Sequence, residues 1–203
     1  MEVKNSGQGQ IFNHPVLEKL TKGHAFVPIT MHFVISAGLL IYSFVFYNIT
    51  PLMLVAYFLG GLLFWTLFEY LAHRYIFHMD TKTKIREKIQ YIFHGVHHEY
   101  PRDRDRVVMP PVPSFLLGVA LIAIFRLVIG LPGFAVVAGF LTGYAFYALI
   151  HYSIHTRIPP RNFTGKLWMH HSYHHYKSNT RAYGVSSPLW DYVFGTMPKS
   201  YRD

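Results

Sequence analysis

Two long stretches of this 203-residue chain are almost free of charged side chains. No Lys, Arg, Asp or Glu lies between Lys22 and Glu69, and Arg126 is the only one between Arg106 and Arg157. A membrane-spanning helix needs about 20 mostly apolar residues, so each stretch has room for two spans. The buried helices of a soluble bundle would show a polar face, and these stretches show none. The pattern therefore indicates an integral membrane protein.

The composition agrees with this interpretation. Charged residues make up 14% of the chain, whereas soluble domains carry about a quarter. The length predicts a single domain, residues 1–203. The chain has no cysteine, which excludes disulfides, cysteine-ligated zinc and iron–sulfur clusters. A net charge of +9 suits nucleic acid or an anionic membrane surface, and the apolar stretches favour the membrane and argue against nucleic acid.

We predict an all-α fold with four transmembrane helices in two hairpins, at about residues 28–47, 51–72, 113–129 and 132–150. The turns read NITP and GLPG, both strong helix breakers, and carry no Lys or Arg. Of the 19 basic residues, 18 lie in residues 1–22, 73–106 and 156–203. The positive-inside rule places these segments and both termini in the cytoplasm. Residues 73–112 and 151–203 are then expected to form a cytoplasmic helical cap, on a bacterial inner membrane or an endoplasmic reticulum.

Ten of the 14 histidines fall into four short motifs, all on one side of the membrane in this topology. The motifs are HRYIFH (His73, His78), HGVHH (His94, His97, His98), HYSIH (His151, His155) and HSYHH (His171, His174, His175). One such histidine is more commonly a polar surface residue, but ten together argue against that interpretation. Imidazole binds Zn, Cu, Fe and Ni. Ten rings are too many for one ion and enough for two, so the motifs predict a two-metal site.

The spacing within the motifs suggests which rings can meet. Side chains three or four residues apart share a helix face, so the rings within HGVHH, within HYSIH and within HSYHH can converge. His73 and His78 are five residues apart, about 140° around a regular helix. They can reach one centre only if the helix ends or distorts near Phe77. Alternatively, they flank a site between two metals.

Three further side chains are candidates for orienting the ligands. Glu69 precedes His73 by four residues, and a ligating histidine commonly donates its other N–H to a carboxylate. The alternative is a Glu69 neutralised by a nearby arginine. Asp191 can serve another histidine in the same way. Tyr147 precedes His151 by four residues and can orient it, although a tyrosine at the membrane interface is the alternative.

The four motifs and their surroundings resemble a known family. The resembling stretches are EYLAHRYIFHM (69–79), HGVHHEYPRDRDRVVMPPVP (94–113), GYAFYALIHYSIH (143–155), HHSYHHY (170–176) and YGVSSPLWDYVFGT (183–196). In these residues the chain is similar to the fatty acid hydroxylase superfamily of sterol desaturase-like membrane di-iron proteins, most closely to fatty acid 2-hydroxylases. The PPVP sequence favours that branch over the sterol oxidases.

The resemblance implies a four-span protein whose cap holds two irons on the ten motif histidines, with His170 beside the ligands. It implies an O2-dependent oxidoreductase, a monooxygenase that hydroxylates C-2 of long-chain fatty acyl groups in lipid and sphingolipid biosynthesis. Two electrons are expected from a separate carrier, cytochrome b5-like or ferredoxin-like. Zinc also favours imidazole and can occupy such a site in purified protein, although it has no redox chemistry.

Other interpretations remain open at this point. The scaffold also suits a desaturase, or a sterol or carotenoid hydroxylase. A metal transporter is disfavoured because its ligands should lie near the bilayer midplane, where only His32 falls within a predicted span. The head group of an acyl substrate, or only lipid phosphates, can be held by cationic side chains near the histidines. The candidates are Arg102, Arg104, Arg106 and Lys177.

Overall fold

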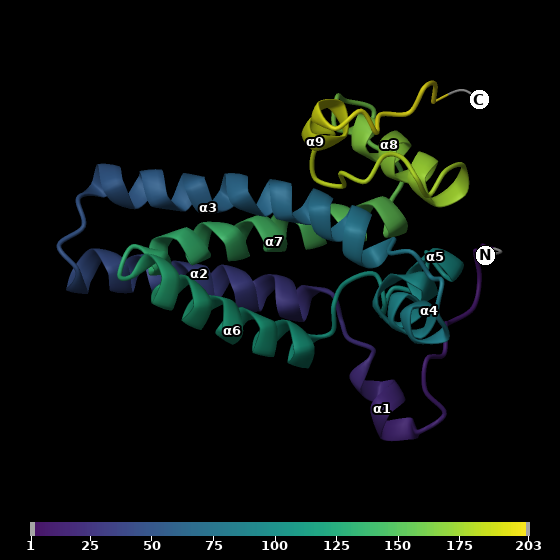
Figure 1. Ribbon diagram of the computed structural model, residues 1–203, viewed down its shortest axis with the longest axis horizontal. Helices are drawn as coiled ribbons and strands as arrows, with labels where there is room; N and C mark the ends of the chain where they lie inside the picture. The colour runs from purple at the N-terminus through teal and green to yellow at the C-terminus, as the bar shows by residue number, and fades with distance from the viewer. Residues whose placement is uncertain (1–2, 202–203) are drawn as a thin grey trace.

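Four long helices run side by side, and the shorter helices gather at one end of them (Figure 1). The structure is a computed structural model that describes residues 3–201, and within this range it has no β-strand. The long helices are α2 (Phe26–Phe46), α3 (Pro51–Ala72), α6 (Pro111–Ile129) and α7 (Gly133–Thr156). Each is long and apolar enough to cross a membrane. The predicted all-α fold with four spans in two hairpins is confirmed.

The remaining helices and the segments that connect them form what we call the cap. It lies where α3 and α7 end and where α2 and α6 begin (Figure 1). Two of its elements, η1 and η2, are single π-helical turns. The cap helices are α1 (Pro15–Leu20), η1 (His73–Phe77), α4 (Lys84–Gln90), η2 (Tyr91–Gly95), α5 (Val96–Glu99), α8 (Gly165–Tyr176) and α9 (Leu189–Val193).

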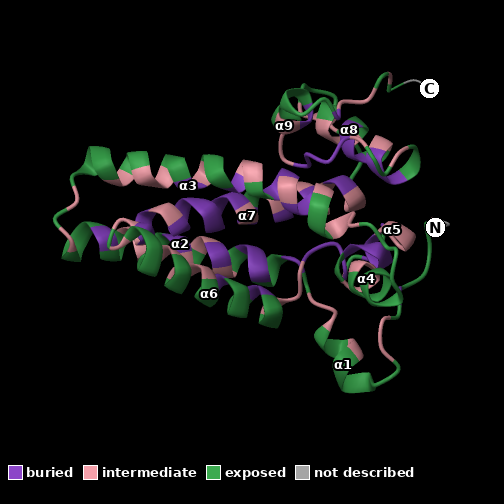
Figure 2. Ribbon diagram, viewed as in Figure 1, coloured by how far each residue is buried: buried purple, intermediate pink, exposed green. Residues whose placement is uncertain are grey.

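The helix α7 is the centre of the bundle. More than half of its residues are buried, whereas α2, α3 and α6 expose much of their apolar surface (Figure 2). Leu52 of α3 and Leu127 of α6 are 80% and 83% exposed. Apolar faces of this size on long helices suit contact with lipid rather than with water.

Glycines let α3 and α7 approach until their backbones touch. A Cβ atom added at Gly61 would lie 1.9 Å from the carbonyl oxygen of Val136, and one at Gly139 would lie 1.9 Å from that of Phe58. Small residues at such crossings are typical of helices that pack within membranes. The close contact sets the end of α7 beside the end of α3, which brings His151 toward the histidines that follow α3.

One boundary differs from the sequence prediction in a way that matters for the histidines. The α7 helix continues to Thr156, six residues beyond the predicted end at residue 150. The HYSIH motif is therefore the last part of a spanning helix, and the separate cap segment begins after it. Hydropathy falls at His151, but no proline or glycine interrupts the helix before Pro159, so the backbone hydrogen bonds continue.

Candidate metal centre

All ten motif histidines come together where the cap meets the ends of α3 and α7. They form two groups, and within each group one ligand atom from every residue lies within 4.8 Å of all the others. The first histidine group is His73, His78, His94, His98 and His174. The second histidine group is His97, His151, His155, His171 and His175.

Each group combines two pairs of neighbouring rings with one single ring. A pair shares one helical face, and the single ring comes from a helix that gives a pair to the other group. The first group has the pairs His73/His78 after α3 and His94/His98 on η2 and α5, with the single ring His174 on α8. The second group has the pairs His151/His155 on α7 and His171/His175 on α8, with the single ring His97 on α5.

The pair His73 and His78 depends on a local change of helix type. At His73 the α3 helix becomes the π-helical turn η1, and the amide of His78 donates to the carbonyl oxygen of His73 at 3.1 Å. A bond between residues five apart makes a wider turn than an α-helix does, so both rings reach the same group. The predicted distortion near Phe77 is confirmed, and both rings lie in the first histidine group rather than on either side of a site between the two groups.

The triplets HGVHH and HSYHH do not each converge on one centre as the spacing suggested. His97 separates from His94 and His98, and His174 separates from His171 and His175. Consecutive residues point about 100° apart on a helix. Because a histidine group lies on each side of α5 and α8, the two rings four residues apart point into one group and the third ring points into the other.

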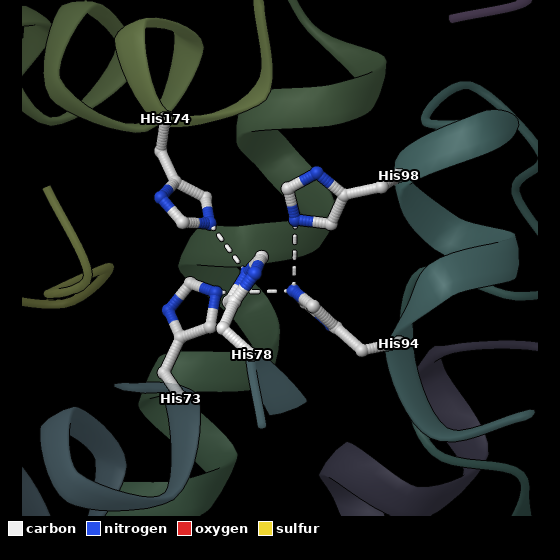
Figure 3. A group of neighbouring side chains, drawn as sticks. All are labelled: His73, His78, His94, His98 and His174. Carbon is white, nitrogen blue, oxygen red and sulfur yellow. Dashed lines mark hydrogen bonds between the residues drawn. The ribbon is translucent and has the colours of Figure 1, made fainter. Parts of the chain in front are cut away.

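The ring nitrogens in each group face one another at short range. In the first group, Nε2 of His94 lies 3.0 Å from Nε2 of both His73 and His98, and Nε2 of His174 lies 2.8 Å from that of His78 (Figure 3). In the second group the corresponding distances are 3.0 to 3.1 Å. Two nitrogens each about 2.1 Å from one ion, at right angles, lie about 3.0 Å apart. The spacing fits one ion in each group.

The hydrogen bonds of the rings lead to the same conclusion. Nδ1 of His73 lies 2.5 Å from the carbonyl oxygen of Tyr183, and Nδ1 of His174 lies 2.8 Å from that of Arg181. A carbonyl only accepts, so each Nδ1 carries the proton and each Nε2 presents a lone pair to its group. Among residues 3–201, neither ring nitrogen of buried His175 has a hydrogen-bond partner. Unprotonated nitrogens that face one another in a buried site lack hydrogen-bond partners, and a bound cation would accept their lone pairs.

Burial keeps these rings neutral at ordinary pH. It lowers the pKa of His78 to about 3, with repulsion from His174 as the second cause. Burial first, and neighbouring imidazoles second, also lower the pKa of six other cap histidines well below the usual value. These are His94, His97, His98, His171, His174 and His175. A metal ligand must be deprotonated, so the rings are ready to bind without losing a proton.

Glu69 acts on a different partner from the one we predicted. Nδ1 of His73 is already bonded to Tyr183, and the Glu69 carboxylate accepts from the amides of Val185 at 2.7 Å and Ser186 at 2.9 Å and from the Ser186 hydroxyl. One helical turn before His73, Glu69 faces the segment 181–187 rather than the rings. It therefore holds the segment that holds His73.

Asp191 does bind a histidine, and that histidine is His170. Nε2 of His170 lies 3.0 Å from the Asp191 carboxylate, and its Nδ1 lies 2.9 Å from the hydroxyl of Tyr201. Asp191 also accepts from the amides of Tyr183 at 2.9 Å and Gly184 at 2.7 Å. His170 lies outside both histidine groups, next to His171 in the sequence.

Tyr147 packs against His151, as its position four residues earlier suggested. The two rings stack with centroids 5.4 Å apart and planes 25° apart. Sequence patterns did not indicate the carbonyl oxygens of Arg181 and Tyr183, which hold two of the rings. Backbone acceptors exist at every position, so only the fold shows which ones matter.

The sequence model for the family described as "Fatty acid hydroxylase" matches residues 58–196. This range is more than half of the chain and contains all ten grouped histidines. The chain belongs to the fatty acid hydroxylase family.

Similar proteins share most of this chain but are longer. Dihydroceramide fatty acyl 2-hydroxylase FAH2 of Arabidopsis thaliana is 39% identical over 68% of this chain and 59% of its own length. Ceramide very long chain fatty acid hydroxylase scs7 of Schizosaccharomyces pombe is 37% identical over 95% of this chain and 56% of its own. A solved structure of full-length scs7p, with only the hydroxylase domain visible, matches with a TM-score of 0.84 and 32% identity over 95% of this chain and 73% of that one. The chain thus spans a little over half the length of the two curated relatives.

In this fatty acid hydroxylase family member, Arg106 is committed to holding the N-terminal segment on the cap. Its side chain is buried, and its guanidinium donates to the carboxylate of Glu18, to Thr21 and to the carbonyl oxygen of Gly9, with Asp103 3.4 Å away. We no longer expect Arg106 to hold a head group, because these partners occupy most of its donors. The other three candidates, Arg102, Arg104 and Lys177, lie exposed on the cap.

A cavity of about 440 Å³ leads from the histidines into the bundle. It reaches Phe140 on α7, 11 residues before His151, which is about 16 Å along the helix. Polar side chains that sequence reasoning did not select, Ser114 and Tyr144, line it beside His32. Most of the wall is apolar, and four ligand candidates border it: His73, His94, His97 and His151.

Proposed function

We propose that this protein is a membrane di-iron monooxygenase that hydroxylates C-2 of a long-chain fatty acyl group. The observation that carries the proposal is the apolar cavity bordered by both five-histidine groups. The names of the relatives, which include a fatty acyl 2-hydroxylase and a ceramide fatty acid hydroxylase, support the position of the hydroxyl group and the substrate class. The reaction joins one oxygen atom of O2 to carbon, reduces the other to water, and consumes two electrons and two protons.

The chain's own residues would bind and shield, and bound iron would supply the activation of O2. An alkyl C–H bond is too strong for side-chain acid–base chemistry, so a redox metal is required. The ten imidazoles would hold the ions with neutral nitrogen ligands. This arrangement differs from the carboxylate-rich sites of soluble di-iron bundles.

The cavity would take the acyl tail. Its volume lies within the usual range for small-molecule sites, about 300–1,000 Å³, and its walls come from helices with lipid-facing outer surfaces. In this proposal, the tail passes from the bilayer core into the cavity between these helices. Apolar walls next to the histidines also keep water away from the reacting carbon.

The cap would face the cytoplasm, where 18 of the 19 basic residues then lie. Electrons would come from a separate carrier, cytochrome b5-like or ferredoxin-like, that docks on this side. The exposed Arg102, Arg104 and Lys177 are proposed to hold an anionic head group or nearby lipid phosphates. The histidine groups are made of residues at the ends of α3 and α7 and in the cap, whereas a transporter is expected to bind its ion near the middle of the bilayer.

Lipid mass spectrometry with ¹⁸O2 tests the proposal. Cells that express the chain together with a cytochrome b5 and its reductase should accumulate 2-hydroxy acyl lipids that carry one ¹⁸O. A His174→Ala variant should lose the product, and the matched control His14→Ala, which changes an exposed histidine outside both groups, should keep it. A product two hydrogens lighter, with no added oxygen, would instead identify a desaturase. An oxygenated sterol or carotenoid would identify a hydroxylase of another substrate class.

A further inference from the structure

We infer that the two histidine groups hold their metal ions unequally, and that Glu69 and Asp191 are positioning residues that strengthen the hold of the first group. The inference rests on the metal binding proposed above. It concerns the segment 181–187, which bonds to the rings of the first group from outside.

Two rings of the first group are fixed by backbone carbonyls of this segment. Nδ1 of His73 donates to Tyr183 at 2.5 Å and Nδ1 of His174 donates to Arg181 at 2.8 Å. Such an outer hydrogen bond sets the tautomer and orientation of a ligating ring and makes its free nitrogen a stronger ligand. The first group is thereby prepared for an ion before one arrives.

Four rings of the second group show no such hydrogen bond. Among residues 3–201, Nδ1 of His97, of His151, of His171 and of His175 is buried without a hydrogen-bond partner, although the backbone of Val107 lies close to His151. Packing holds these rings instead, as in the stack of His175 on His98, with centroids 4.1 Å apart and planes 12° apart. Packing fixes the plane of a ring but not which nitrogen carries the proton. Binding an ion here must therefore also select the tautomer.

Two buried carboxylates hold the segment 181–187 in place. The Glu69 carboxylate accepts from the amides of Val185 and Ser186, at 2.7 and 2.9 Å. The Asp191 carboxylate accepts from the amides of Tyr183 and Gly184, at 2.9 and 2.7 Å. The amide and the carbonyl of Tyr183 thus connect Asp191 directly to His73.

The segment also has little room to shift. A Cβ atom added at Gly184 would lie 2.1 Å from the carbonyl oxygen of Ser187 and 2.9 Å from Oδ2 of Asp191. Glu69 and Asp191 are 5% and 0% exposed, so water does not replace a lost carboxylate oxygen at either site. Removing one acceptor leaves a buried N–H unpaired, and the carbonyl that holds His73 or His174 must move with the segment.

Outer partners of ligating histidines typically change metal affinity by about 10-fold to 100-fold. Metal-free full-length protein in detergent micelles should therefore bind Co²⁺ in two steps that differ by about tenfold or more in affinity. The titration is monitored by the visible absorption of Co²⁺ and by the amount of metal bound to the protein. A His174→Ala variant should remove the tighter step, and a His171→Ala variant should remove the weaker one.

The positioning residues should affect one step only. Glu69→Gln and Asp191→Asn should each weaken the tighter step by about 10-fold to 100-fold and leave the weaker step unchanged, which also shows that the variant is folded. Asp103→Asn is the matched control. Asp103 is a buried cap carboxylate that accepts from the amide of Gly9, and both steps should survive its loss.

Three results would overturn the inference: two equal steps in the unaltered protein, equal weakening of both steps by Glu69→Gln or Asp191→Asn, or a loss of the tighter step in Asp103→Asn. The titration needs no substrate, so its result does not depend on whether the protein hydroxylates a lipid. Unequal steps without any hydroxylated lipid would refute the proposed reaction alone. An ¹⁸O-labelled product with equal steps would refute this inference alone.

Discussion

Replacing Arg106 by glutamine distinguishes a structural role from the head-group role that the sequence suggested. The guanidinium is buried between two carboxylates, with Asp103 1% and Glu18 16% exposed. Removing one member of a buried ion pair costs about 3–5 kcal/mol, because the other charge stays buried and unpaired. Here Lys22, 3.7 Å from Glu18, relieves part of that cost, whereas Asp103 has no second cation at this distance among residues 3–201.

We therefore expect Arg106→Gln to lower the stability of the cap by about 3 kcal/mol, the low end of that range. For a chain of this size that corresponds to a fall of roughly 6–12 °C in the unfolding midpoint. Thermal unfolding in detergent micelles, followed by intrinsic fluorescence, measures it. The matched control is Arg104→Gln, which changes an exposed arginine two residues away and should alter stability by less than about 0.5 kcal/mol.

A second substitution identifies the origin of the loss. Asp103→Asn in the Arg106→Gln background should restore part of the stability, because it removes the unpaired charge. If Arg106→Gln unfolds at the same temperature as Arg104→Gln, and only the substrate concentration needed for turnover rises, then the structural role is wrong and Arg106 binds the head group.

Three further changes test the bundle, the cavity and the metal sites. Gly118→Leu should lower the yield of hydroxylated lipid by about tenfold or more with Co²⁺ binding unchanged, because Gly118 lines the cavity and its Cβ would lie 3.4 Å from Nε2 of His32; an undiminished yield would mean that the tail lies elsewhere. Gly139→Ala should cost about 1–3 kcal/mol in a thermal melt through overpacking against α3, whereas Gly60→Ala, which meets open space, should cost nothing. Metal-free protein should lose stability as the pH falls from 7 to 5, because the histidines bind protons in the unfolded chain and remain neutral when buried in the folded one. The pKa of His78 is about 3 in the folded protein and about 6.5 in the unfolded chain, so this ring alone lowers the stability by about 2 kcal/mol over that range. A melt that is independent of pH over this range would contradict the neutral rings.

The sequence carried enough information to find the ten grouped histidines, but not to divide them between the two groups. Residue type, motif spacing and the side of the membrane are all visible in the letters. The division depends on the rotation of short helices, since His97 and His98 are neighbours in the chain and lie in different groups. The spacing of five residues between His73 and His78 suggested a distortion after α3, but it did not identify that distortion as a π-helical turn.

The errors concern side chains whose partners are distant in sequence. Arg106 stands in an alternating acidic and basic stretch that reads as exposed, and only the folding of residues 9–21 against it makes it buried. Glu69 has the correct spacing for a hydrogen bond to His73, but its carboxylate instead accepts hydrogen bonds from amides of the segment 181–187. The spans were placed within a few residues, except at the end of α7, because hydropathy locates the apolar layer and does not locate the end of a helix.

The helix α8 follows all four spans in the sequence and gives rings to both groups. Without it, four ring nitrogens remain in the first group and three in the second. A chain emerging from the ribosome can therefore insert both hairpins before either group is complete. Once ions are bound, they tie the C-terminal part of the chain to segments roughly a hundred residues earlier, such as His174 to His78, across a loop whose closure constrains the unfolded chain as a disulfide would. In a protein without cysteine, the metal ions would be the cross-links, formed last and reversible by a chelator.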